Sequence, residues 1–250
     1  MNRLSDLRGR TVLLTGAAGG IGSALARRLA ADGARLVLAY RRDEQGATRL
    51  ADELRAGGAE AVTAGADLAE PDAPARLVRA AEAALGPADV LVNNAGYSRQ
   101  CAWPDVDLET WNLTHAVNLR APFLLTQLVL PGMMQRAFGR ILYLSSVAAY
   151  TGGVVGPHYA SSKAGLHGLV HYFAGRSAKH GVTVNAIAPA LIAETGMFRR
   201  PADDATARPL AVPVGRYGTP EEVADLALAM LRNGYLTNQV ILLDGGIHPQ

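Results

Sequence analysis

The sequence has one cysteine, Cys101, little excess charge and no long apolar run, and these absences exclude several classes of protein. A single cysteine cannot form an internal disulfide or a cysteine-cluster metal site. A net charge of +2, without basic blocks interleaved with aromatic residues, argues against nucleic-acid binding. No run of about 18 apolar residues is present, and residues 1–10 are polar where a signal peptide would be apolar. We therefore expect a cytoplasmic protein that binds neither membrane nor nucleic acid.

What remains is typical of one globular domain. The chain has 250 residues, of which 49% are hydrophobic and 18% charged. Short apolar runs alternate with helical patterns, and these runs cover residues 11–15, 35–40, 61–66, 89–93, 139–145, 181–189 and 239–244. The alternation predicts a single α/β domain over residues 1–250, with a Rossmann-like, doubly wound parallel sheet of about seven strands and helices on both faces.

The most informative stretch runs from Ser146 to Lys163, with Tyr159 four residues before the lysine. A phenol is a poor acid or base near neutrality because its unperturbed pKa is about 10. On a helix, residues 159 and 163 share one face, so the ammonium can lie beside the phenol and lower its pKa. Ser146 follows the apolar run 139–145, which places its hydroxyl at a strand end, where α/β folds bind ligands. A surface tyrosine and lysine is the alternative, since this spacing is common by chance.

A glycine-rich turn follows the first apolar run and precedes a helical pattern at residues 24–31. This order of strand, turn and helix is typical of a pyrophosphate site. Glycines allow the backbone to approach closely, and a helix N-terminus offers N–H groups and the positive end of its dipole. The contacts we predict are Gly16, Gly19, Gly20, Ile21 and Gly22.

The end of the second apolar run predicts which dinucleotide is bound. An acidic residue there would bond the 2′-hydroxyl of NAD, whereas an arginine accommodates the 2′-phosphate of NADP. The sequence has Tyr40 at that place, followed by Arg41 and Arg42. We therefore expect NADP(H) in preference to NAD(H), which remains possible, with Arg41 the better placed contact. The alternative is that both arginines only flank a solvated helix start.

Two further strand ends carry candidate cofactor contacts. Asp67, followed by Leu68, could accept a hydrogen bond from the adenine amino group. The fourth apolar run ends in Asn93, Asn94, Ala95 and Gly96, where small residues would let the backbone lie against a ribose. Asparagines at such a turn form side-chain to backbone hydrogen bonds.

Thr15-Gly-x-x-x-Gly-x-Gly22, Asn93-Asn-Ala-Gly96 and Ser146 with Tyr159-x-x-x-Lys163 together resemble the short-chain dehydrogenase/reductase family over nearly the whole chain. The resemblance implies that Ser146, Tyr159 and Lys163 are catalytic and that Lys163 also holds the nicotinamide ribose, with Tyr159 beside it. Gly19 departs from the pattern, because many NADP-using relatives have a basic residue there.

The resemblance also implies that the main-chain carbonyl of Asn118 completes the catalytic set by holding a relay water. Residues 107–122 are helical by period, and Pro122 lacks an N–H. In a helix, the carbonyl four residues before a proline loses its partner. That carbonyl belongs to Asn118, although a plain helix kink is the alternative.

After residues 181–189, the family holds the nicotinamide carboxamide through backbone groups, which implies contacts at Pro189, Ile192 and Thr195. Ala190 stands where the family usually has a glycine. The spacing from Pro189 to Thr195 is one residue longer than the family pattern. The irregular, proline-containing stretch at about 190–213 is the predicted substrate lid.

Several other side chains are candidates for less specific roles. Trp103 and Tyr150 could line an apolar pocket or pack in the core. His158 could touch substrate, whereas His167 and His171 are expected to serve packing or an interface. The six histidines share no ligand spacing with acids or cysteines, so no metal is expected.

The reaction implied is hydride transfer between a nicotinamide and a carbonyl or secondary alcohol, with Tyr159 as the proton donor in reduction and Ser146 orienting the oxygen. The wording of the motifs is most similar to the 3-oxoacyl-(acyl carrier protein) reductase group, which implies an acyl-thioester substrate. The alternatives are a sugar, small alcohol or secondary-metabolite ketone as substrate, or a catalytically silent NADP(H)-binding sensor or scaffold. The family also implies a homotetramer.

Overall fold

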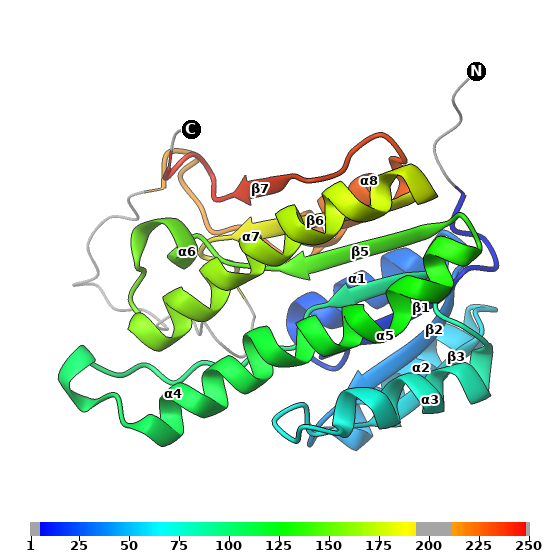
Figure 1. Cartoon of the computed structure of the whole chain (residues 1–250), viewed down its shortest axis with the longest axis horizontal. Helices are drawn as coiled ribbons and strands as arrows, with labels where there is room; N and C mark the ends of the chain where they lie inside the picture. Colours follow the sequence, from blue (N-terminus) through cyan, green and yellow to red (C-terminus); the bar gives the residue numbers. More distant parts are fainter. Residues whose placement is uncertain (1–5, 194–211, 249–250) are drawn as a thin grey trace.

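A computed structural model describes residues 6–193 and 212–248. Seven parallel strands form one sheet in the order β3-β2-β1-β4-β5-β6-β7 (Figure 1). They are β1 (Thr11–Thr15), β2 (Arg35–Tyr40), β3 (Ala61–Gly65), β4 (Val90–Asn93), β5 (Gly139–Leu144), β6 (Val182–Pro189) and β7 (Val240–Leu243). The predicted doubly wound parallel sheet is therefore confirmed.

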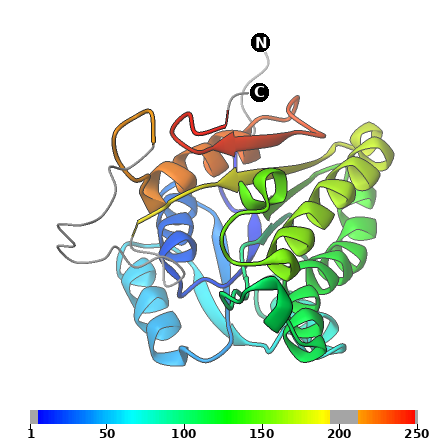
Figure 2. The ribbon, with the colours of Figure 1, turned by 90° about the vertical axis from the view of Figure 1, so that its left-hand side faces the viewer.

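Helices cover both faces of the sheet, which therefore lies between two helical layers (Figure 2). The main helices are α1 (Gly20–Ala31), α2 (Glu44–Ala56), α3 (Ala73–Leu85), α4 (Leu108–His115), α5 (Ala121–Gln135), α6 (Ala148–Thr151), α7 (Pro157–Ser177) and α8 (Pro220–Arg232). Helices α1, α2 and α8 pack on one face, and α3, α5 and α7 pack on the other. Because both faces are covered, the central strands are apolar at nearly every position.

The helical stretch expected from residue 107 onward is interrupted. Residues Ala116–Arg120 form a π-helical turn, η2, in which the N–H of Ala121 donates to the carbonyl of Ala116. Pro122, near the start of α5, cannot supply the N–H that a continuous α-helix would need. The chain before Pro122 therefore forms a π turn, a feature common at functional sites.

Two short 3₁₀ turns complete the fold, η1 (Trp103–Asp105) and η3 (Ala178–His180). Within the described ranges, none of the helices has the length and apolar character needed to cross a membrane.

The turn between β1 and α1 has no room for a side chain at its last glycine. A Cβ on Gly22 would lie 2.1 Å from the carbonyl oxygen of Gly16 and 2.9 Å from the Cα of Ala17. A Cβ on Gly19 would come no closer than 3.5 Å to that oxygen, which is ordinary contact. Backbone atoms cannot move aside as a flexible side chain can, so Gly22 fixes how closely α1 approaches the turn.

Substitution at these two glycines should therefore have unequal effects. We expect Gly22→Ala to lower the free energy of unfolding by about 1–3 kcal/mol, the usual cost of overpacking. Gly19→Ala should change it by less than about 0.5 kcal/mol, since Gly19 has φ −76° and ψ 167°, which alanine adopts readily. Urea unfolding of the ligand-free protein measures both, and equal effects would contradict this account of the turn.

Candidate active site

The polar residues singled out in the sequence gather at the carboxyl ends of the strands. In a parallel sheet these ends lie at one edge, and here the chain reverses its direction of strand addition between β1 and β4. One group of residues surrounds a pocket at β1, β2 and β4, and the other follows β5 and continues along α7.

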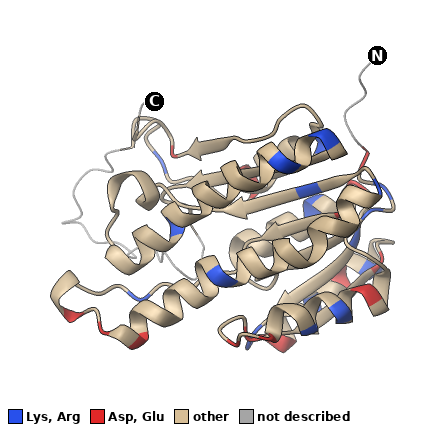
Figure 3. Ribbon diagram, viewed as in Figure 1, with Lys and Arg blue, Asp and Glu red and all other residues tan. Residues whose placement is uncertain are grey.

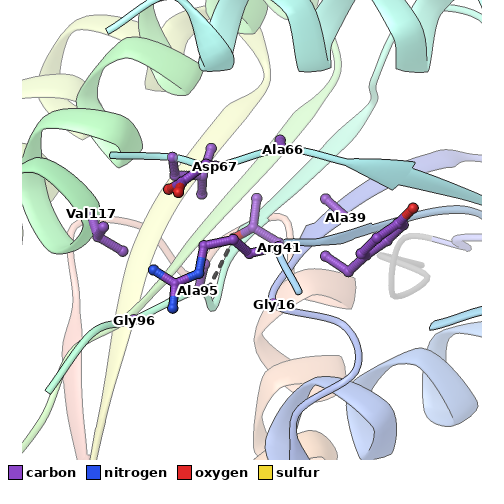
Figure 4. Close-up of a pocket in the computed structure, with 11 residues that line it drawn as sticks. Gly16, Ala39, Arg41, Ala66, Asp67, Ala95, Gly96 and Val117 are labelled. Atoms are coloured by element: carbon purple, nitrogen blue, oxygen red, sulfur yellow. Dashed lines mark hydrogen bonds between the residues drawn. The ribbon is translucent and has the colours of Figure 1, made fainter. Parts of the chain in front are cut away.

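The pocket at β1, β2 and β4 is shown in Figure 4. Six of the predicted cofactor contacts line it: Gly16, Arg41, Asp67, Leu68, Ala95 and Gly96. Five residues that were not predicted as contacts also line it: Thr15, Ala39, Tyr40, Ala66 and Val117. Thr15, Ala39 and Ala66 lie at or next to the ends of predicted strands. That position in the sequence could have identified them as pocket residues.

A network around Thr15 holds the floor of this pocket. The Thr15 hydroxyl accepts hydrogen bonds from the amides of Asn94 (3.1 Å) and Ala95 (3.0 Å), and the Asn94 side chain donates to the carbonyls of Thr15 and Gly16, both at 3.0 Å. The prediction that an asparagine ties this turn is therefore confirmed for Asn94. The buried amide of Asn93 has no hydrogen-bond partner in the described part of the chain.

At the end of β2, the two arginines differ. Arg41 lines the pocket, and its guanidinium extends across it toward Gly96 (Figure 4), whereas Arg42 does not line it. Arg41 is exposed and forms no ion pair with a described residue. Asp43 caps α2 by accepting from the amide of Gly46 at 2.8 Å. The arrangement therefore leaves Arg41 available to an anionic group in the pocket.

Beyond β5, the structure brings Ser146, Tyr159 and Lys163 together. Strand β5 ends at Leu144, so Ser146 lies two residues past the strand, slightly later than the sequence predicted. Its hydroxyl is hydrogen-bonded to the Tyr159 phenol and also accepts from the amide of Ala148 at 3.2 Å. Tyr159 lies in the first turn of α7 and Lys163 one turn later, as the spacing of four residues requires.

Lys163 is buried, with only 4% of its surface exposed. Its Nζ donates to the carbonyl of Leu144 at 2.6 Å and lies 5.7 Å from the centre of the Tyr159 ring. The sequence from residue 141 to 162 contains no charged residue, and helix α6 is accordingly uncharged in Figure 3. Burial lowers the pKa of Lys163 to about 8, because the ammonium loses much of its hydration.

The expected lowering of the Tyr159 pKa is wrong for this arrangement. Burial raises the pKa of Tyr159, and the hydrogen bond from Ser146 lowers it only in part. The Lys163 ammonium donates to the carbonyl of Leu144 at the end of β5. The phenol therefore favours its protonated form, the form that a proton donor requires.

Asn118 lies in the π turn, and both polar atoms of its side chain are hydrogen-bonded. Its Oδ1 accepts from the amide of Tyr97 at 2.7 Å, while its Nδ2 donates to the Tyr97 carbonyl and to the Ser162 hydroxyl, both at 3.0 Å. Ser162 in turn donates to the carbonyl of Tyr159 at 2.7 Å. Any chemical role of Asn118 therefore falls to its main chain, whose α-helical partner would be the missing N–H of Pro122.

The predicted nicotinamide contacts are only partly brought to this edge. Pro189 ends β6, and its carbonyl accepts from the amide of Val147 at 3.0 Å, next to Ser146. Ile192 bridges to Gly218 and lines a second cavity beside β7. Thr195 and most of the predicted lid at 190–213 lie outside the described residues.

The structure also shows the surroundings of the aromatic and histidine side chains that the sequence offered as candidates. Trp103 is 78% exposed, which contradicts core packing, and Tyr150 lies against the His167 ring with centroids 5.0 Å apart. His158 is completely buried, so direct contact with substrate is wrong as an interpretation of this side chain. Across residues 6–193 and 212–248, histidine, cysteine and acidic side chains form no cluster that could hold a metal ion.

The buried charge of Lys163 makes a stability prediction. The pKa is about 8 in the folded protein and higher when unfolded, so the unfolded chain binds more protons between these values and stability rises with pH there. Below pH 8 the lysine is charged in both the folded and the unfolded protein, so the full cost of burying its ammonium is present. We expect Lys163→Met to remove this rise, so that the variant gains about 1–3 kcal/mol relative to wild type at pH 7 and loses that gain by pH 10.

Lys179 is the only other lysine, and it is exposed, which makes Lys179→Met the matched control. Denaturant unfolding at several pH values measures the difference, and NMR of protein labelled with ¹⁵N-lysine follows the two side chains directly. A difference that does not vary with pH would refute the lowered pKa.

Comparison with known proteins agrees with this geometry. Residues 10–205 match the family model described as short chain dehydrogenase. The chain is 35% identical to a 3-oxoacyl-[acyl-carrier-protein] reductase of Synechocystis sp., over 98% of this chain and 99% of that protein. It is 36% identical to an L-rhamnose 1-dehydrogenase (NAD(P)(+)) of Azotobacter vinelandii, over 95% of this chain and 96% of that protein.

Among solved structures, a blue fluorescent protein from a metagenomic library, in complex with NADPH, superposes with a TM-score of 0.89 and 33% identity. The match covers 98% of this chain and 100% of that one. With its seven-stranded parallel sheet and its serine, tyrosine and lysine at the carboxyl edge, the chain belongs to the short-chain dehydrogenase/reductase family.

Proposed function

We propose that this oxidoreductase is an NADPH-dependent reductase of 3-oxoacyl thioesters. The observation that carries the proposal is the hydrogen-bonded pair of Ser146 and Tyr159, with Lys163 buried one helical turn away. The high coverage of the Synechocystis 3-oxoacyl-[acyl-carrier-protein] reductase supports the substrate class.

The residues present fit NADP(H). A Cβ on Gly16 would lie 2.9 Å from the Cα of Ala95, so only a glycine lets these two lining residues pack this closely. The N–H groups that open α1 suit the pyrophosphate, Asp67 and Leu68 suit the adenine, and Arg41 suits the 2′-phosphate. The bound cofactor would supply the hydride.

The catalytic residues then act on the substrate oxygen. Ser146 orients the carbonyl by a hydrogen bond, and Tyr159 donates its proton to that oxygen as negative charge develops there. The raised pKa of Tyr159 suits this direction, because the phenol is protonated before reduction begins. A lysine with a pKa of about 8 can give up a proton near neutrality and thereby return one to the tyrosine. The Asn118 carbonyl would hold the water that resupplies it.

We further propose a homotetramer that acts in the cytoplasm. Exposed apolar side chains on α4, α5 and α7 support the assembly, and these are Trp111, Phe123, Leu128 and Tyr172. Analytical ultracentrifugation of the wild type and of Leu128→Asp gives the oligomeric state, and a wild-type monomer would contradict this proposal.

The reaction itself is tested by following NADPH oxidation at 340 nm with acetoacetyl-CoA. We expect the wild type to turn over and Tyr159→Phe to lose about 10²- to 10⁴-fold in kcat while still binding NADPH. Tyr143→Phe is the matched control, because Tyr143 is also buried but its hydroxyl bonds to Thr126, away from Ser146. If the wild type binds NADPH yet reduces no thioester, sugar or simple ketone, the silent-binder alternative replaces this proposal.

Cofactor preference is tested at the two arginines. A charge-assisted hydrogen bond is worth about 1.5–3 kcal/mol, so Arg41→Ala should weaken NADPH binding about 10- to 100-fold and leave NADH binding nearly unchanged. Arg42→Ala should have a much smaller effect, since Arg42 does not line the pocket. Titration by protein fluorescence gives the four dissociation constants, and equal losses from both variants would contradict the assignment of Arg41.

A further inference from the structure

The segment after β4 runs beside the start of α7 and is anchored at every second residue. Tyr97 is held at both its amide and its carbonyl by the Asn118 side chain. The carbonyl of Arg99 lies 3.0 Å from Nε2 of His158, and the amide of Cys101 donates to the carbonyl of Val155 at 2.9 Å. The middle anchor is thus the side chain that directly precedes Tyr159 in α7.

The tautomer of His158 follows from its partner. A carbonyl oxygen can only accept, so Nε2 of His158 carries the proton and donates it to Arg99. Nδ1, the other ring nitrogen, is buried without a hydrogen-bond partner in the described structure. The side chain has no exposed surface at all. A buried nitrogen left unpaired is costly, and an apolar ring would avoid that cost. Packing alone therefore does not explain the histidine, whereas the bond to Arg99 does.

The surroundings of His158 leave little freedom. A Cβ on Gly156 would lie 2.7 Å from Cε1 of His158 and 2.7 Å from the carbonyl oxygen of Cys101. Gly156 also has φ +137°, a conformation that other residues rarely adopt. The ring, the glycine and the 97–101 segment are therefore in close contact, and the segment cannot shift without disturbing the start of α7.

We propose that His158 is a positioning residue, which fixes residues 97–101 as one wall of the substrate site relative to the Tyr159 hydroxyl. The role in turnover rests on the proposed reductase function. The link continues outward, because the Arg99 side chain donates to the Thr110 hydroxyl at 3.0 Å and so joins the same segment to α4. Loss of the His158 bond should therefore loosen the wall without altering the cofactor pocket.

Two substitutions of His158 separate its hydrogen bond from its volume. His158→Phe keeps a ring but loses the donor, whereas the side-chain amide of His158→Gln can still donate to the Arg99 carbonyl. With acetoacetyl-CoA and NADPH, we expect the phenylalanine variant to lose about 3- to 10-fold in kcat/KM, mainly through KM, with the dissociation constant of NADPH unchanged. The glutamine variant should recover most of the loss. Equal KM values for wild type and the phenylalanine variant would overturn the proposal, as would an equal loss in both variants.

A second readout does not depend on turnover. Hydrogen exchange followed by mass spectrometry should show faster exchange in the peptide around residues 97–103 in His158→Phe, with no change around Gly16. Gly156→Ala, which crowds the same contact with His158 intact, should have the same effect on that peptide. If wild type fails to reduce the thioester, the proposed function falls, and the exchange data still decide whether His158 holds the wall. Unchanged exchange in both variants would show that it does not.

Discussion

The burial of the Lys163 charge is the constraint on which the arrangement of the site depends. An ammonium inside a protein must keep a hydrogen-bond acceptor, and here the acceptor is the carbonyl of Leu144 at the end of β5. That bond fixes α7 against the strand, so Tyr159, one turn earlier, lies beside Ser146 just beyond the same strand. No acidic side chain of the described structure neutralises the lysine, so its pKa falls toward neutrality. The cost in stability and the capacity to exchange protons have the same physical origin.

Around this point, polar side chains bind backbone and thereby define which groups are presented to a ligand. Thr15 and Asn94 hold the turn at the end of β4, and Asn118 holds Tyr97 and Ser162. The pocket lining includes the small residues Gly16, Ala95 and Gly96, with Arg41 as its cation. The hydroxyls of Ser146 and Tyr159 are hydrogen-bonded to each other. A substrate oxygen that forms hydrogen bonds to both hydroxyls would join this pair.

Much of this was predictable from local pattern. The glycine turn and the cap at Asp43 follow from residue chemistry over a few positions. Other features depended on distant neighbours. Residues Ala116–Arg120 form a π turn, and Ile192 bridges to Gly218 and lines the cavity beside β7. The direction of the Tyr159 pKa shift depended on how deeply the phenol is buried, which spacing does not specify.

The sequence by itself determined the parallel α/β fold, the glycine-rich turn after β1 and the spacing that places Tyr159 and Lys163 on one helical face. These are periodic or local properties, encoded within a few residues of one another. The tertiary structure alone decided that Lys163 donates to the end of β5, that Arg41 and not Arg42 lines the pocket, and that His158 is buried against the Arg99 carbonyl. Each of these depends on burial and on partners far away in the chain, and both arise only when the strands and helices pack together.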